Sequence, residues 1–300
     1  MIKIANCPDS WGVLFPEDEK QIGWERFADE FCRAGYRYLE LGPYGYWPTD
    51  LSLRQEFDRR GIVCISGAIG GHFEESMDVW NEQIREKCPY YKALGCEYVV
   101  LAGGRYNDRV TRRFTHPRYL PEKDWDLFIA HVNEIAHIIA EEYGMSVVYH
   151  PHADTHIEQE FQIERFLLET DPKEVNLCFD TGHHIISGGE PVSFVRNFGD
   201  RITFLHVKNV NGALKNAVIE KRLGNLESLE AGIYTRLDQG EMDFRELKAA
   251  LEKWSFDGYA VIEQDVYPID LTAAEDDYNG PLTVQTKNAE YLEEIGFGMR

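Results

Sequence analysis

The sequence predicts an α/β fold, a (β/α)₈ barrel formed as a single domain over residues 1–300. Short runs of apolar, β-branched and aromatic residues alternate with amphipathic stretches along the whole chain. Their count, eight strands each followed by a helix, is the count of this barrel. The apolar runs are continuous, which is typical of parallel strands buried on both faces.

The predicted strands are short and lead into glycines, turns or polar residues. They are Ile2–Cys7, Tyr36–Leu41, Ile62–Ile69, Tyr98–Ala102, Ser146–Pro151, Val175–Phe179, Ile202–Val207 and Tyr259–Glu263. The predicted helices have apolar residues at three- and four-residue steps, and several are followed by a glycine. They are Gln21–Ala34, Leu51–Arg60, Met77–Leu94, Lys123–Tyr143, Gln162–Glu169, Pro191–Phe198, Phe244–Lys253 and Thr286–Glu294.

The longest irregular region follows the seventh strand and includes residues 211–241. It contains a helix-like piece at Ala217–Leu229, together with Gly232, Gly240 and Tyr234. Loops of this length in a compact domain usually carry a function. We therefore expect a lid over the active site or an arm that mediates oligomer formation.

The formal net charge of −21 makes a nucleic-acid partner unexpected, because no run of Lys and Arg offsets the repulsion of phosphates. The six cysteines have no paired spacing and are expected to be free, buried thiols. The N-terminus does not read as a signal peptide, and no apolar run approaches the roughly 18 residues of a membrane span. We expect a cytoplasmic enzyme without a membrane partner, assembled as a homodimer or homotetramer.

Polar residues, most of them of types that bind metals, lie where four successive predicted strands meet the loops that follow them. In chain order they are His150 and His152, Asp180 and His183, His206 and Lys208, and Glu263 and Asp265. Barrel active sites lie at the carboxyl ends of the strands. Because side chains alternate along a strand, residues two apart point the same way. A mixed imidazole and carboxylate set suits one divalent cation. Manganese is the expected ion, with cobalt, magnesium, zinc and iron as alternatives.

Other polar and aromatic residues at the predicted strand ends are expected to bind the substrate. They are Glu40, His72, Trp11, Tyr44 and Asp265. Aromatic rings stack on sugar faces, although core packing explains any single ring equally well. His184 is expected to face opposite to His183, and His116 has no evident partner in the sequence.

Taken together, these motifs resemble the xylose-isomerase-like TIM barrels of the sugar phosphate isomerase/epimerase group. They are most similar to the inosose dehydratase-like branch. The stretches that carry the resemblance are Pro8–Val13, Glu40–Tyr46, His150–His152, Asp180–His183 and Ile262–Asp265. The resemblance covers essentially the whole chain.

The resemblance implies one divalent metal held by Glu, Asp, His and Glu from strands five to eight. Asp180, His206 and Glu263 match the last three positions. His150 stands where many relatives have the first Glu, a substitution also found in the dehydratase-like branch. We expect His150 as the metal ligand, while His152 or a water molecule remain alternatives.

The presence of His150 in place of a Glu also changes which reaction is expected. Epimerases of this group resemble two-base enzymes with a carboxylate on each side of the reacting carbon, and His150 removes one of these bases. β-Elimination needs only one proton removed beside a ketone and an acid that assists the leaving oxygen. The resemblance thus implies a carbon–oxygen lyase that acts through an enediolate on a keto-cyclitol (inosose) or a 3-keto-sugar or glycoside. The expected catalytic residues are His152, Lys208, His183 and Glu263.

A ketose 3-epimerase or sugar isomerase on the same metal site is the alternative. A non-catalytic partner of an oxidoreductase is a third interpretation, and the intact ligand set argues against it. A phosphodiesterase or abasic-site nuclease is opposed by the net charge. A nucleotide-dependent dehydrogenase lacks its glycine-rich loop between a strand and a helix.

Overall fold

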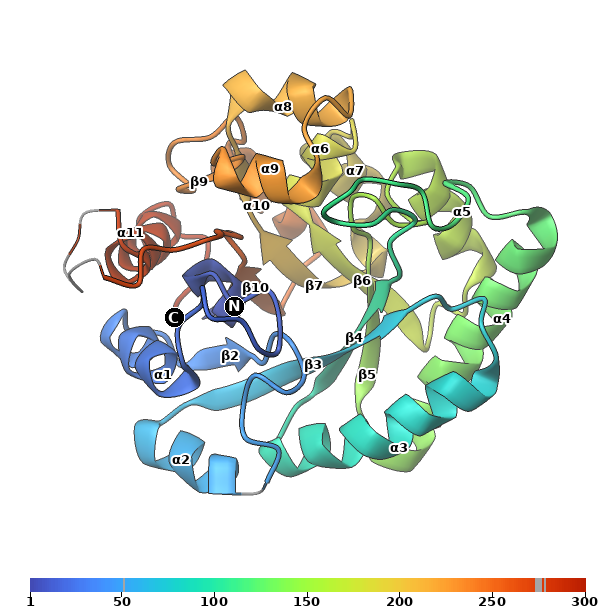
Figure 1. The fold of residues 1–300 in the computed structure, drawn as a ribbon, viewed down its shortest axis with the longest axis horizontal. Coiled ribbons are helices and arrows are strands. Elements are labelled where there is room, and N and C mark those ends of the chain that lie inside the picture. The colour runs from blue at the N-terminus through green and yellow to red at the C-terminus, as the bar shows by residue number, and fades with distance from the viewer. Residues whose placement is uncertain (51, 273–276, 278) are drawn as a thin grey trace.

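Eight parallel strands close into a barrel at the centre of the molecule (Figure 1). Each strand pairs with its neighbour in the chain, and β1 closes the ring against β10. The barrel strands are β1 (Lys3–Asn6), β2 (Tyr38–Glu40), β3 (Val63–Gly71), β4 (Tyr98–Gly103), β5 (Ser146–His150), β6 (Val175–Asp180), β7 (Ile202–Val207) and β10 (Tyr259–Ile262). The predicted (β/α)₈ barrel is confirmed.

The structure is a computed structural model, and it describes residues 1–50, 52–272, 277 and 279–300. Leu51, the expected first residue of the second helix, lies outside these residues. Within them, no helix has the length and apolar character needed to cross a membrane. All six cysteines are free.

Helices surround the barrel on the outside. They are α1 (Trp24–Arg33), α2 (Ser52–Arg60), α3 (Met77–Leu94), α4 (Glu122–Ile138), α5 (Glu160–Glu169), α7 (Pro191–Phe198), α10 (Phe244–Lys253) and α11 (Pro281–Glu294). A π-helical turn, Ile139–Tyr143, continues α4. The last helix begins at Pro281 rather than at Thr286 as predicted, because proline is well suited to the first helical position.

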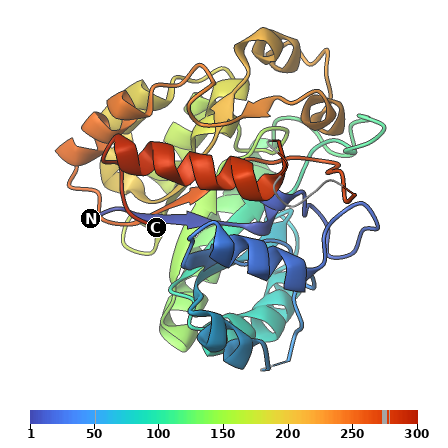
Figure 2. The ribbon, with the colours of Figure 1, turned by 90° about the vertical axis from the view of Figure 1, so that its left-hand side faces the viewer.

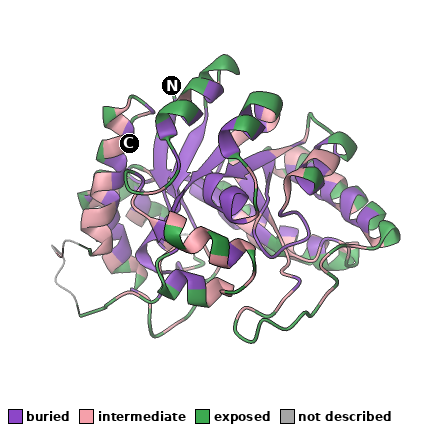
Figure 3. Ribbon diagram, turned by 90° about the horizontal axis from the view of Figure 1, so that it is seen from above, coloured by how far each residue is buried: buried purple, intermediate pink, exposed green. Residues whose placement is uncertain are grey.

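The core has two layers, and buried strands separate them (Figure 3). The larger layer lies between the strands and the outer helices. The smaller layer fills the barrel interior, where the rings of Tyr98 and Phe204 lie 5.1 Å apart and those of Tyr38 and Tyr259 lie 5.4 Å apart. A cavity opens at the carboxyl ends of the barrel strands.

Residues 209–242, here called the cap segment, lie between β7 and β10. The segment begins and ends in a small antiparallel pair, β8 (Asn209–Val210) with β9 (Tyr234–Thr235). Between these strands are α8 (Gly212–Ile219) and α9 (Asn225–Glu230), so the helix-like piece predicted at Ala217–Leu229 is interrupted. Figures 1 and 2 show both helices beyond the carboxyl end of β7.

Candidate metal centre and catalytic cavity

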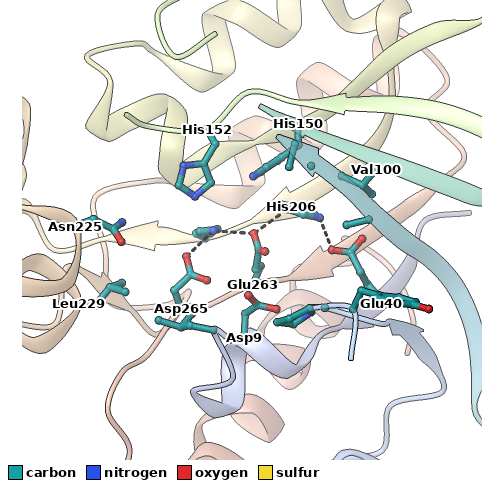
Figure 4. Close-up of a pocket in the computed structure, with 18 of the residues that line it drawn as sticks. Asp9, Glu40, Val100, His150, His152, His206, Asn225, Leu229, Glu263 and Asp265 are labelled. Carbon is teal, nitrogen blue, oxygen red and sulfur yellow. Dashed lines mark hydrogen bonds and ion pairs between the residues drawn. The ribbon is translucent and has the colours of Figure 1, made fainter. Parts of the chain in front are cut away.

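Four potential metal ligands come together at the carboxyl ends of adjacent strands. Figure 4 labels three of them, His150, His206 and Glu263. His150 and Asp180 end β5 and β6, His206 lies one residue before the end of β7, and Glu263 follows β10 directly. The parallel register pairs Asp180 with His206. One nitrogen or oxygen atom from each residue lies within 4.8 Å of the others, and all four residues are buried.

The imidazole of His206 lies between three carboxylates. Its Nδ1 is 2.7 Å from Oε2 of Glu263 and 3.7 Å from Oδ2 of Asp180. Its Nε2 is 3.0 Å from Oε1 of Glu40, whose other oxygen accepts a hydrogen bond of 2.7 Å from the Ser66 hydroxyl. A carboxylate against the second nitrogen typically orients a metal-ligating histidine. Glu40, expected to bind substrate, lines the cavity and also positions His206.

Several buried atoms of this group lack a partner with hydrogen-bond geometry among the described residues, although some lie at ion-pair distance. They are Nδ1 of His150, Oδ2 of Asp180, both ring nitrogens of His206 and Oε2 of Glu263. Buried polar atoms are rarely left in this state. A divalent cation would bind to such donors, and the imidazole–carboxylate set suits manganese, cobalt, zinc or iron. The residues present therefore fit a metal ion.

Lys208 extends the charged group toward the cavity. Its Nζ is 2.7 Å from Oε2 of Glu263 and 3.2 Å from Oδ2 of Asp180. It also donates hydrogen bonds to Oδ2 of Asp265 at 2.7 Å and to Nε2 of His183 at 3.0 Å. The ammonium group of Lys208 therefore contacts Glu263 and Asp180, which belong to the potential ligand group. It also contacts Asp265, which is not one of those four ligands.

His183 lies behind Lys208 and does not line the cavity. Because Nε2 of His183 accepts from Lys208, Nδ1 carries the proton, and it lies 3.1 Å from the Tyr234 hydroxyl. Both ring nitrogens are thus occupied. His183 thus contacts Lys208 and Tyr234 and is not among the described residues that line the cavity, and its expected catalytic role stays a prediction.

Burial governs the protonation of the metal-site residues. It lowers the pKa of His150 to about 3 and raises the pKa of Asp180 to about 7. Burial also disfavours the charged form of Lys208, but Asp180 and Asp265 outweigh this penalty and raise its pKa well above the usual range. A bound cation would add positive charge and lower the pKa of the carboxyl groups. His150 is accordingly neutral and available as a ligand.

His152 points into the same cavity as His150, as the alternation along the strand predicts (Figure 4). Its Nδ1 lies 2.7 Å from the carbonyl oxygen of Ala153. A carbonyl only accepts, so Nδ1 carries the hydrogen and Nε2 keeps its lone pair. Burial, together with the positive charge of Arg105, holds the pKa of His152 well below its usual range. The side chain is therefore a neutral base.

The cavity has a volume of about 310 Å³, within the range of small-molecule sites. One wall carries Asp9 and Tyr44, and the cap segment supplies Asn225 and Leu229 (Figure 4). Burial and the charge of Glu263 raise the pKa of Asp9 well above its usual range. The cavity thus combines charged groups that can bind hydroxyls with apolar surface for a ring.

Two residues expected to bind substrate lie elsewhere. Trp11 is fully buried, and its Nε1 donates to Glu30 at 2.9 Å, because a 3₁₀ turn over Pro8–Trp11 directs the ring into the outer core. His72 follows a strand that ends at Gly71, whose φ of 147° turns the chain, and it does not line the cavity. The expectations for Tyr44 and Asp265 agree with their places at the cavity wall.

The sequence did not indicate several cavity residues. Arg109 comes from the loop between β4 and α4, and its guanidinium lies 5.3 Å from the ring centroid of Phe15. Asn225 and Leu229 come from α9, and Tyr234 reaches His183 from β9. Arg109 lies in a loop and the other three lie in the cap segment, and no periodicity in the chain indicates how either lies against the barrel. Asp9 differs from them, because its place after the first predicted strand already makes it a candidate.

A sequence profile described as "Xylose isomerase-like TIM barrel" matches residues 29–295. The chain is 28% identical over 277 residues to an inosose dehydratase from Geobacillus thermodenitrificans (strain NG80-2), covering 89% of this chain and 91% of the relative. It is 29% identical over 273 residues to the rhizopine catabolism protein MocC of Rhizobium meliloti, covering 89% and 82%.

Solved structures share the fold. The IOLI protein with a binding zinc atom has a TM-score of 0.70 and 14% identity, covering 99% of both chains. The probable 3-DHS dehydratase AsbF of Bacillus anthracis has a TM-score of 0.69 and 15% identity, covering 95% of this chain and 98% of that one. Because the profile match extends over most of the barrel, this chain belongs to the xylose isomerase-like TIM barrel family.

Proposed function

We propose that this protein is a divalent-metal-dependent dehydratase, a carbon–oxygen lyase that acts on a keto-cyclitol or keto-sugar. The observation that carries the proposal is the position of His152. A neutral base with a free Nε2 faces the same cavity as the His150, Asp180, His206 and Glu263 group. The inosose dehydratase relatives, which align along most of their own length, support the lyase assignment.

The metal would be held by His150, Asp180, His206 and Glu263, and would polarise the ketone oxygen of the substrate. His150 is favoured over His152 as the fourth ligand, because His150 forms one group with Asp180, His206 and Glu263. Manganese remains the first ion to test. Zinc is the second, since a structure of this fold carries it.

His152 would remove the proton beside the ketone through Nε2. Its Nδ1 hydrogen bond to Ala153 fixes the tautomer, and the ring of His183, whose centroid is 3.6 Å away, holds its orientation. A general base held in this way typically contributes about 10²–10⁴-fold to the rate.

Two groups that line the cavity, Lys208 and Asp9, would assist the departure of the leaving oxygen. Lys208 donates hydrogen bonds and stabilises the negative charge that develops as the carbon–oxygen bond breaks. Asp9, whose buried carboxyl has a raised pKa, supplies the proton that makes water the leaving group. The electron pair of the broken carbon–hydrogen bond forms the new carbon–carbon double bond. The proton on His152 then passes to solvent.

The test is incubation of the metal-loaded protein with a keto-inositol or a 3-keto-glucoside in D₂O, followed by proton NMR and mass spectrometry. An enone-type product that has lost water, or an alcohol from the glycoside, supports the proposal. Deuterium at the carbon beside the ketone, with otherwise retained mass, would instead assign a ketose epimerase. If every keto-sugar and keto-cyclitol is recovered unchanged, the proposal is wrong.

A further inference from the structure

A second group of metal-type side chains lies outside the catalytic cavity. His72 and Glu74 follow β3, and His156 lies in the loop between β5 and α5. One potential ligand atom from each lies within 4.8 Å of the others. None of the three residues lines the catalytic cavity. We propose that His72, Glu74 and His156 bind a zinc ion that joins the loops around the barrel mouth.

His72 and Glu74 are left without suitable partners. Nδ1 of His72 is 3.4 Å from Oε1 of Glu74, yet Nδ1 and the other carboxylate oxygen of Glu74 are buried without hydrogen-bond geometry among the described residues. Their side chains are only 18% and 15% exposed, so solvent satisfies them poorly. Such buried atoms need an explanation, and an ion bound between them provides one.

His156 already has the second contact that a ligand histidine requires. Its Nε2 lies 2.9 Å from the carbonyl oxygen of Pro117. The carbonyl accepts, so Nε2 carries the hydrogen and Nδ1 keeps the lone pair. Metal-ligating histidines usually donate their other ring nitrogen in this way. Burial lowers the pKa of His156, so the imidazole is neutral and able to bind a metal.

The surrounding residues hold the His72 ring in place. It stacks on His116 with ring centroids 3.7 Å apart. Gly104 allows the close approach, because a Cβ there would lie 2.7 Å from the imidazole. For Glu74, burial favours the neutral acid, but the neighbouring His72 and His156 lower its pKa. The carboxylate is therefore ionised and ready to bind a cation.

The donor set determines the ion and its role. Two imidazoles and one carboxylate are a common zinc set with one position open. The three ligands come from two loops, and Pro117 and His116 bring in a third, the loop between β4 and α4. That third loop carries Arg109 of the catalytic cavity. A zinc ion here stabilises the wall of the cavity without taking part in the reaction.

The test counts zinc in the full-length protein after chelation, reloading with zinc and desalting, by elemental mass spectrometry. The Glu74→Gln variant is expected to hold one zinc per chain fewer than the natural protein. The control is His137→Gln, because His137 also faces a glutamate, Glu174, at 2.9 Å but its side chain is 62% exposed. It should hold the natural amount of zinc.

Equal zinc content in the natural protein and the Glu74→Gln variant overturns the inference. If Glu74→Gln is insoluble, His72→Gln replaces it with the same expected loss. Asp180→Asn separates the two sites, because it should lose the ion of the catalytic cavity and keep the ion held by Glu74. The outcome is thus independent of the proposed reaction.

Discussion

At the residue scale, each functional side chain is restricted by a second contact. Glu40 faces Nε2 of His206, the Ala153 carbonyl takes the hydrogen of His152, and His183 accepts from Lys208. In His206 and His152, the contact engages one ring nitrogen and leaves the other directed at the site. The chemistry of the cavity therefore depends on pairs of residues, and substitution of the second residue should change the site without emptying it.

Two variants at the cavity separate proton removal from loss of the leaving group. His152→Gln should lower both elimination and the exchange of the substrate proton beside the ketone by roughly 10²–10⁴-fold. Asp9→Asn should lower elimination to a similar degree and leave exchange in place, because the base is intact. NMR in D₂O measures both. Exchange retained in His152→Gln would contradict the assignment of the base.

The contact between Glu40 and His206 predicts an effect on metal affinity. Glu40→Gln should weaken binding of the catalytic metal roughly 10–100-fold, as is typical when a residue that orients a ligand is replaced. Titration with the metal, followed by activity, measures this. Glu174→Gln is the matched control, because Glu174 also faces a histidine nitrogen but lies on the surface. An unchanged affinity in Glu40→Gln would show that His206 needs no such support.

At the scale of elements, ion pairs of Lys221 attach the cap segment to the loop that follows β5. Nζ of Lys221 lies 2.7 Å from Oδ1 of Asp154 and 3.4 Å from Oε2 of Glu158. Asn225 and Leu229, a few residues further along, form part of the cavity wall. We propose that the cap segment closes over the substrate and that the Lys221 contact favours the closed position.

This proposal predicts the behaviour of Lys221→Met. The pair is 37% exposed on the lysine side, and such pairs contribute at most about 1 kcal/mol, so KM should rise by no more than about fivefold with kcat little changed. Steady-state kinetics measure both constants. Lys248→Met removes a similar pair on α10 and should leave KM unchanged. Equal KM values in both variants would argue against closure.

At the scale of the whole molecule, the stability of the fold should fall at low pH. His184, which does not line the cavity, contributes to this fall. Burial lowers the pKa of His184 from 6.5, although Glu160 opposes the shift. Below pH 6.5 the unfolded chain binds a proton that the folded chain refuses, so the free energy of unfolding falls as the pH falls. One such group adds at most about 1.4 kcal/mol per pH unit.

His184→Gln removes this group and should reduce the slope of unfolding free energy against pH between 6.5 and 5. Urea unfolding of the chelated protein at several pH values provides the slope. The glutamine can still donate to Glu160, which lies 2.8 Å from Nε2 of His184. A variant with the slope of the natural protein would show that His184 already carries its proton when folded.

The sequence predicts the barrel because its strands are buried on both faces, which leaves continuous apolar runs in the chain. It also predicts His150, Asp180, His206 and Glu263, because strand ends in a barrel meet at one place.

The direction that the chain takes after a strand ends cannot be read from the apolar pattern of the sequence. The turn that follows decided the position of Trp11, and the left-handed Gly71 decided that of His72. Arg109 lies in a loop and Leu229 in the cap segment, and the arrangement of both depends on tertiary contacts.

The antiparallel pair β8–β9 has an evolutionary consequence. Asn209 pairs with Thr235 and Val210 with Tyr234, so the stretch between them leaves and rejoins the barrel at one point. A genetic exchange of that stretch would leave the β8–β9 pair that bounds it intact. The metal ligands lie outside it, whereas Asn225 and Leu229 lie within it. Related lineages could therefore acquire new substrate preferences by recombination here while inheriting the same reaction chemistry.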